Sequence, residues 1–229
     1  MIAENLNRIN QEIDKICQKV GRKRSEIRLI GVSKTQPVET IREALEAGLK
    51  DFGENKAQEL RDKFELISGD FNWHFIGHLQ TNKVKYVIHS AHFIHSVDSI
   101  KVAEEINKKA KSISKIQNIL LEINTSLEAS KFGLSKEKEI FETAEFCKNS
   151  SNLNLLGLMT MAPYTNEKNI IRNCFNSLRR LLDKMNNEGY NLTELSMGMT
   201  NDYDIAIEEG STMLRIGTAI FGERNYINQ

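Results

Sequence analysis

The sequence predicts a single (β/α)8 barrel, and two observations support this prediction. Short apolar runs alternate with segments of helical periodicity along nearly the whole chain, which is the order expected for parallel strands connected by helices. Eight such runs fit within about 200 residues, near the lower end of the usual length for this fold. An open, doubly wound sheet is the alternative fold, because the runs near Phe52 and Leu195 are short.

An extra helix is expected before the first strand, over residues 1–21. Apolar residues recur there at spacings of three and four, and Gly21 supplies a C-terminal stop. We expect this helix to pack against the barrel. A coiled-coil partner helix is the alternative interpretation, but the pattern lasts only about two heptads.

The barrel is expected to occupy residues 27–222, and the whole chain of 1–229 is expected to form one domain. No segment rich in proline, serine or glycine divides it. Pro37 is expected to open the helix after the first strand, and the clearest apolar helical stripe runs from Ile170 to Met185. The expected strands are 27–32, 51–53, 73–76, 92–97, 119–123, 153–159, 194–196 and 213–216.

Composition excludes several classes of protein. Lysine plus arginine and aspartate plus glutamate both number 31, so the chain lacks the basic surplus usual in nucleic-acid-binding proteins. No apolar run is long enough for a membrane span, and the N-terminus does not resemble a secretory signal, so we expect a cytoplasmic protein. Cys17, Cys147 and Cys174 are far apart, and we interpret them as small buried hydrophobic residues.

In such a barrel, functional residues collect where the strands end, and Lys34 lies two residues after the first strand. Partial burial lowers the pKa of a lysine and makes its amine nucleophilic. A Schiff-base lysine is therefore one interpretation. A surface lysine with a buried stem, or one in a salt bridge, is the other.

The loops after strands seven and eight predict a phosphate site. Ser196, Gly198 and Thr200 precede an expected helix start at residues 201–204, and Gly217 and Thr218 follow the last strand. Helix starts and glycine turns present backbone N–H groups to anions. Combined with a lysine on strand one, this pattern suggests a ligand with an aldehyde and a phosphate, namely pyridoxal 5′-phosphate (PLP).

The histidines do not predict a metal site. His74 lies inside a strand and could face the pocket, whereas His78, His92 and His95 lie within or beside strands without converging acidic or cysteine partners. We interpret them as core or rim residues. The sequence also lacks a Ser-His-Asp arrangement with a nucleophile elbow and a phosphate-binding Walker loop.

At these strand ends the sequence resembles the pyridoxal phosphate homeostasis protein family, and the resemblance covers nearly the whole chain. Thr200 stands where serine is frequent in that family, and either hydroxyl would serve. The matching segments are 29–35, 52–59, 73–83, 157–161, 195–202 and 210–222.

The resemblance implies one barrel similar to the N-terminal domain of alanine racemase, with PLP held by Lys34 as an internal aldimine. It places the phosphate on 199–200 and 217–218, sets Arg215 near the pyridine nitrogen, and puts Asn55 close to the ring. No catalytic and no metal-binding residues are expected. The full set of expected cofactor-binding residues is Lys34, Asn55, His74, Met159, Ser196, Met199, Thr200, Arg215, Gly217 and Thr218.

Members of the family are regarded as regulators of cofactor supply and of amino- and keto-acid balance. An arginine beside the ring nitrogen disfavours its protonation, which weakens the ring as an electron sink. Alanine racemase also takes a tyrosine base from a second domain, and this sequence ends at Gln229, so we expect no such domain. We therefore expect a monomeric PLP carrier that exchanges cofactor with apo PLP-dependent enzymes. A small racemase or decarboxylase-like enzyme is the alternative.

Overall fold

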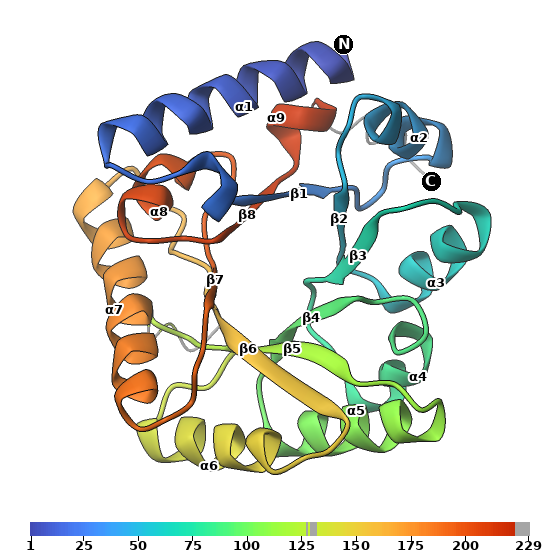
Figure 1. The fold of residues 1–229 in the computed structure, drawn as a ribbon, viewed down its shortest axis with the longest axis vertical. Coiled ribbons are helices and arrows are strands. Elements are labelled where there is room, and N and C mark those ends of the chain that lie inside the picture. The colour runs from blue at the N-terminus through green and yellow to red at the C-terminus, as the bar shows by residue number, and fades with distance from the viewer. Residues whose placement is uncertain (127, 129–131, 223–229) are drawn as a thin grey trace.

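Eight parallel strands close into one barrel, in which each strand pairs with the next and β8 pairs with β1 (Figure 1). The structure is a computed structural model and describes residues 1–126, 128 and 132–222. The closed ring confirms the predicted barrel, and the open-sheet alternative is wrong. The strands are β1 (Arg28–Val32), β2 (Asp51–Glu54), β3 (Asn72–Phe75), β4 (Phe93–Val97), β5 (Gln117–Glu122), β6 (Leu153–Met159), β7 (Glu194–Ser196) and β8 (Met213–Ile216).

A ring of helices surrounds the strands in Figure 1. Pro37 is the N-cap of α2, as predicted, because its fixed φ suits the residue before a helix. Over the described residues the helices are α1 (Ile2–Lys19), α2 (Val38–Glu46), α3 (Ala57–Leu66), α4 (Val84–Val87), α5 (Ile100–Ser112), α6 (Glu137–Lys148), α7 (Lys168–Asn187), α8 (Tyr203–Glu208) and α9 (Thr218–Phe221), with 3-10 turns η1 (Arg24–Glu26) and η2 (Thr81–Lys83).

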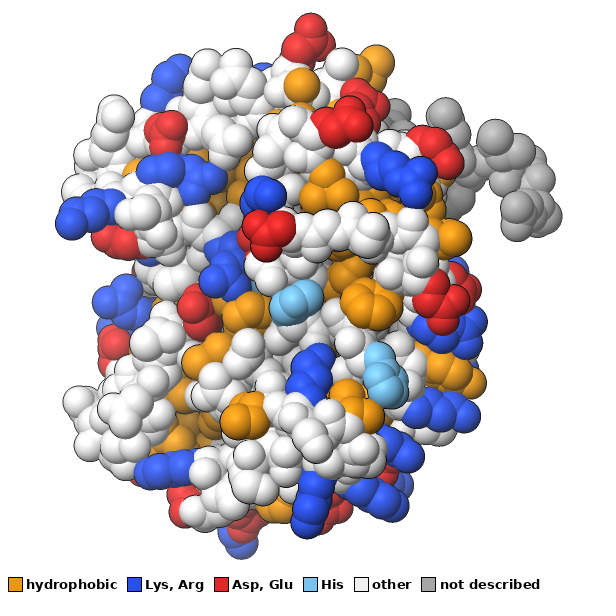
Figure 2. Space-filling model, turned by 45° about the vertical axis from the view of Figure 1, so that its right-hand side comes forward, with side chains coloured by type: hydrophobic (Ala, Val, Ile, Leu, Met, Phe, Trp, Pro, Cys, Tyr) orange, Lys and Arg blue, Asp and Glu red, His pale blue; other side chains and the backbone are white. Residues whose placement is uncertain are grey.

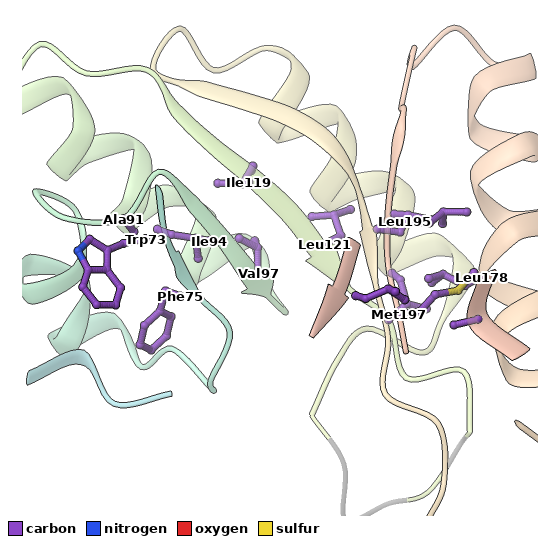
Figure 3. Packing of buried hydrophobic residues seen from close by; sticks show 14 of the residues in the cluster. Trp73, Phe75, Ala91, Ile94, Val97, Ile119, Leu121, Leu178, Leu195 and Met197 are labelled. Carbon is purple, nitrogen blue, oxygen red and sulfur yellow. The ribbon is translucent and has the colours of Figure 1, made fainter. Parts of the chain in front are cut away.

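The main core lies between the strands and the helices. Figure 3 shows outward-facing side chains of β7, such as Leu195, next to Leu178 of α7, and all of these side chains are buried. Trp73 and Phe75 of β3, also labelled in Figure 3, are buried in the same core outside the barrel. Because side chains alternate along a strand, the residues between them point into the barrel. Burial of each large apolar side chain contributes roughly 1.5–3 kcal/mol to folding.

The inside of the barrel is partly apolar and partly polar. A second core cluster fills part of it with Ile30, Phe93, Leu120, Met159 and Met213. The polar or charged side chains buried on the strands include His74, His95, Glu122, Ser196 and Arg215. Buried polar groups are costly unless they are hydrogen-bonded, so their partners are informative.

The N-terminal helix packs against the barrel, as predicted. Its apolar stripe, which includes Leu6 and Ile13, is buried in the main core, and this leaves no apolar seam for a coiled-coil partner. The Asn5 amide donates to the Ile220 carbonyl at 3.0 Å, and Tyr203 donates to Glu12. Figure 1 shows α1 lying across α8 and α9, so it contacts the helices that follow β7 and β8.

The distribution of surface charge and the burial of the cysteines are as expected from the composition. Basic and acidic side chains are intermingled over the face shown in Figure 2, without a large area of one charge. All three cysteines are buried, which confirms the prediction for them. Among the described residues, no helix has the length and apolar character needed to cross a membrane.

Candidate functional site

A cavity of about 230 Å³ opens at the carboxyl ends of β1, β7 and β8. Its walls also include six residues that sequence analysis did not assign to the site, namely Val32, Ala162, Pro163, Tyr164, Asn201 and Asp202. Of the ten predicted site residues, those that line the cavity are Lys34, Met199, Thr200, Arg215, Gly217 and Thr218.

Barrel closure brings these residues together from the two ends of the chain. β1 and β8 pair in register, with Ile30 opposite Arg215 and Gly31 opposite Ile216. The residues that follow the two strands, including Lys34 and Gly217, therefore emerge side by side at the same rim. Sequence analysis selected both residues because functional residues in such barrels lie at the carboxyl ends of the strands, and the structure places both in the wall of one cavity.

Three charged side chains hold the backbone on both sides of Lys34, and we call Lys63, Glu54 and Glu59 the Lys63 cluster. The Lys63 ammonium lies 2.7 Å from a carboxylate oxygen of each glutamate. It also donates to the Ser33 carbonyl at 2.8 Å, while the Ser33 hydroxyl donates to Glu54 at 2.6 Å.

On the other side of Lys34, the Thr35 N–H donates to Glu59 at 2.6 Å. Thr35 has a φ of +66°, a conformation that a β-branched residue rarely adopts. The hydrogen bond to Glu59 holds the chain in this conformation. Burial raises the pKa of Glu54, and the charge of Lys63 opposes that rise. The cluster therefore fixes the position from which the half-buried Lys34 extends.

Arg215 is the charged group at the base of the cavity. One guanidinium nitrogen donates to the Ser196 hydroxyl at 2.6 Å and another to the Thr160 carbonyl at 2.9 Å. Burial lowers its pKa to about 10, against the opposing effects of Asp202 and Glu122. The guanidinium therefore remains cationic at neutral pH and has a fixed orientation.

The loops after β7 and β8 provide backbone donors. Over the described part of the chain, the N–H groups of Thr200, Gly217 and Thr218 have no protein acceptor. The Met199 N–H, in contrast, donates to the Asp202 carboxylate at 2.5 Å. Three N–H groups at one rim suit a phosphate or carboxylate, because such groups stabilise anions at close range.

Gly217 leaves room beside these donors. A Cβ added there would meet nothing nearer than the side chain of Val32, another cavity residue, at 3.5 Å. The glycine is therefore not required by packing within the protein, and its absent side chain allows close approach to the backbone. Gly198 differs, because its φ is +98° and a Cβ would lie 2.6 Å from the Ala206 side chain.

The other four predicted site residues do not line the cavity. Met159 and Ser196 lie inside the barrel, and Ser196 reaches the site through its bond to Arg215. His74 is fully buried and is hydrogen-bonded to side chains of other strands. Asn55 follows β2, and its buried side-chain oxygen has no partner among the described residues.

Glu122 is a titratable group near the site that sequence analysis missed. It is the last residue of β5 and only 4% exposed. Burial raises its pKa to about 7, the charge of Asp98 adds to the rise, and Arg215 opposes it. Its position at the carboxyl end of a strand could have indicated a site residue from the sequence alone. Within residues 1–126, 128 and 132–222, no group of three acidic, histidine or cysteine side chains could hold a metal.

Comparison with known proteins identifies the class of this barrel. The family model described as "Alanine racemase, N-terminal domain" matches residues 5–225. A solved structure of alanine racemase from Clostridium difficile shares the fold at 18% identity, with a TM-score of 0.75 over 99% of this chain and 57% of that chain. The fold and the rim cavity thus define a barrel of the alanine racemase N-terminal type.

Closer relatives narrow the assignment. A protein of Aquifex aeolicus named "Pyridoxal phosphate homeostasis protein" is 45% identical, and the match covers 98% of this chain and 99% of the relative. An Escherichia coli protein of the same name is 37% identical over 98% and 97% of the two chains. The chain therefore belongs to the pyridoxal phosphate homeostasis protein family, as the resemblance predicted.

A solved structure of a third protein adds information about a ligand. PipY of Synechococcus elongatus, solved with PLP bound, is 30% identical and superposes with a TM-score of 0.86 over 97% of this chain and all of PipY.

Proposed function

We propose that this protein binds PLP in the cavity at the carboxyl ends of β1, β7 and β8 and serves PLP homeostasis as a carrier. The observation that supports this most directly is that one cavity is lined by Lys34, Arg215, Gly217 and Thr218. The names of its relatives and the PLP bound to PipY support the choice of ligand.

Each of these residues has a part in the proposal. The amine of Lys34 bonds to the aldehyde carbon of PLP and one water molecule leaves, which forms a Schiff base that hydrolysis reverses. The N–H groups of Thr200, Gly217 and Thr218 receive the phosphate. Arg215 faces the pyridine nitrogen, and Asn55 approaches the ring. When bound, PLP supplies an electrophilic aldehyde and a conjugated ring.

A carrier is favoured over the enzyme alternative by the charge of Arg215. Its pKa of about 10 keeps the guanidinium cationic at neutral pH, so it opposes protonation of a nearby ring nitrogen. An unprotonated ring is a weaker electron sink than a protonated one, which disfavours carbanion chemistry on the cofactor. We propose that the protein is a cytoplasmic monomer that delivers PLP to apo enzymes and thereby affects the amino- and keto-acid balance.

Borohydride reduction of the loaded protein tests the site. Reduction converts the Schiff base into a stable amine, and peptide mapping should find the label on Lys34 only. Lys34→Ala should lose the label, whereas Lys56→Ala, at an exposed lysine just before α3, should keep it. Equal labelling of Lys34→Ala would assign the bond to another lysine.

A transfer assay tests the carrier role. Mixing the loaded protein with an apo PLP-dependent enzyme should restore that enzyme's activity, and free amino acids incubated with the loaded protein alone should stay unchanged. Sustained racemisation or decarboxylation that is abolished by Lys34→Ala would instead establish the enzyme.

A further inference from the structure

A continuous row of hydrogen bonds crosses the inside of the barrel beneath the cavity. It begins at Asp51, the first residue of β2, whose carboxylate lies 2.9 Å from Nε2 of His74. Nδ1 of His74 lies 2.9 Å from Nε2 of His95, and Nδ1 of His95 lies 2.8 Å from the Ser196 hydroxyl. The Ser196 hydroxyl accepts from Arg215 at 2.6 Å.

The two ends of the row and the neutral charge of its histidines fix the direction of every bond. Arg215 has no acceptor atom, so it must donate to the Ser196 hydroxyl, which has a second lone pair and one O–H and can therefore either accept from or donate to Nδ1 of His95. At the other end, the Asp51 carboxylate accepts, so Nε2 of His74 carries a proton. Burial lowers the pKa of His74 and sends that of His95 well below its usual range, so both rings are neutral.

A neutral imidazole carries one proton, and therefore both histidines must carry it on Nε2. His95 then donates to the bare Nδ1 of His74, and the Ser196 O–H donates to the bare Nδ1 of His95. All four hydrogen bonds therefore run the same way, from Arg215 to Asp51. A single reversed bond would leave two donors or two acceptors facing each other in a dry interior, which is costly.

The surroundings hold the row in place. The His74 ring stacks on Phe93 with centroids 4.9 Å apart and planes 2° from parallel. Asp51 also accepts from the Asn72 amide at 3.1 Å, and the Arg28 guanidinium lies 3.9 Å from the same carboxylate oxygen. Burial tends to raise the pKa of Asp51, but His74, Arg28 and Asn72 lower it overall, so the carboxylate is ionised at neutral pH.

We propose that Asp51, His74 and His95 are positioning residues for the cofactor cavity, acting through Ser196 to hold the Arg215 guanidinium in one orientation. The carboxylate at the amino end of β2, 13% exposed, thereby controls a group in the cavity at the opposite end of the barrel. This proposal rests on the proposed function for its ligand, PLP. The hydrogen-bond directions themselves do not depend on PLP.

The first test is nitrogen-15 NMR of the histidine side chains in the cofactor-free, full-length protein. Both His74 and His95 should be neutral with the proton on Nε2. A proton on Nδ1 of either ring, or a doubly protonated ring, would overturn the proposal without any variant.

The second test compares two replacements of Asp51. Asp51→Asn keeps an oxygen acceptor for His74, so both rings should keep their Nε2 protons. Asp51→Leu removes the acceptor, and the nitrogen signals of both rings should change, although His95 does not contact residue 51 directly. Asp70→Leu, at a fully exposed carboxylate, should change neither ring. Unchanged His95 signals in Asp51→Leu would overturn the proposal.

The last readout is PLP affinity, measured by the absorbance of the bound cofactor. Asp51→Leu should bind PLP at least about threefold more weakly than Asp51→Asn, because Arg215 loses its fixed orientation. Equal affinity in a folded Asp51→Leu protein with altered rings would overturn the link to the cavity. Failure of the wild-type chain to bind PLP would overturn the proposed function and leave the NMR result as the test of the hydrogen-bond row.

Discussion

The ammonium group of Lys63 donates a 2.8 Å hydrogen bond to the carbonyl oxygen of Ser33, the residue immediately before Lys34. Lys63 belongs to α3, and Ser33 follows β1, so this contact joins the second βα unit of the barrel to the first. It is buried and surrounded by Glu54 and Glu59. The position of Lys34, the proposed Schiff-base lysine, is therefore determined by a neighbouring unit of the barrel as well as by its own strand.

We expect Lys63→Met to reduce the free energy of unfolding by about 3–5 kcal/mol, because it leaves the buried Glu54 carboxylate without its cation. The double variant Lys63→Met, Glu54→Gln should recover much of this loss, since no unpaired charge remains. Urea unfolding measures both. Lys136→Met removes an exposed ion pair with Glu139 and should change little. An equally small loss for Lys63→Met would show that the buried cluster does not stabilise the fold.

Gly217→Val should weaken PLP binding at least about tenfold, through the loss of one or two hydrogen bonds to the phosphate at about 1.5–3 kcal/mol each. The free energy of unfolding should change much less, because a Cβ at this position meets only an ordinary contact at 3.5 Å. Fluorescence titration with PLP and urea unfolding separate the two effects. An unchanged affinity for PLP in Gly217→Val would show that the phosphate does not bind at this loop.

The pH dependence of the free energy of unfolding should reveal the raised pKa of Glu122. Its pKa is about 7 in the folded chain and 4.5 as the ordinary value, so between these limits the folded state binds more protons than the unfolded state. The free energy of unfolding therefore falls as pH rises from 4.5 to 7, by about 3 kcal/mol for this group. Glu122→Gln should remove this part of the slope in urea titrations at several pH values. An identical slope in the variant would contradict the raised pKa.

Asn5→Ala should affect both stability and ligand binding. The Asn5 amide fastens α1 to the Ile220 carbonyl of α9, the helix that begins at Thr218 in the cavity. Loss of this bond should lower the free energy of unfolding by about 1 kcal/mol and also weaken PLP binding. Asn7→Ala, on the exposed side of the same helix, is the control for both measurements. Unaltered PLP affinity in Asn5→Ala would show that α1 supports the fold alone.

The sequence predicted the strands well because each strand is a local signal. A short apolar run such as 213–216 is bounded by polar turns, and the helix beside it has its own period. The rule that function lies at the carboxyl ends of the strands then selected Lys34, Thr200 and Gly217 without knowledge of any contact.

The hydrogen-bond row and the Lys63 cluster could not be predicted in the same way. They join side chains from different strands and helices, and their partners depend on the exact register of the closed barrel. A partial signal existed, because His74 and His95 lie beside apolar residues in β3 and β4. Such positions indicate polar residues inside the barrel, but they do not say which side chains touch.

Pairing of β1 with β8 has a consequence for the synthesis of the chain. Lys34 leaves the ribosome long before Gly217, yet the two residues line one cavity only after the last strand has docked beside the first. A nascent or truncated chain that lacks β8 cannot form the site, and contacts between residues so distant in sequence form slowly. A ligand held by both loops stabilises only the closed barrel, so loading with that ligand distinguishes completed molecules from unfinished ones.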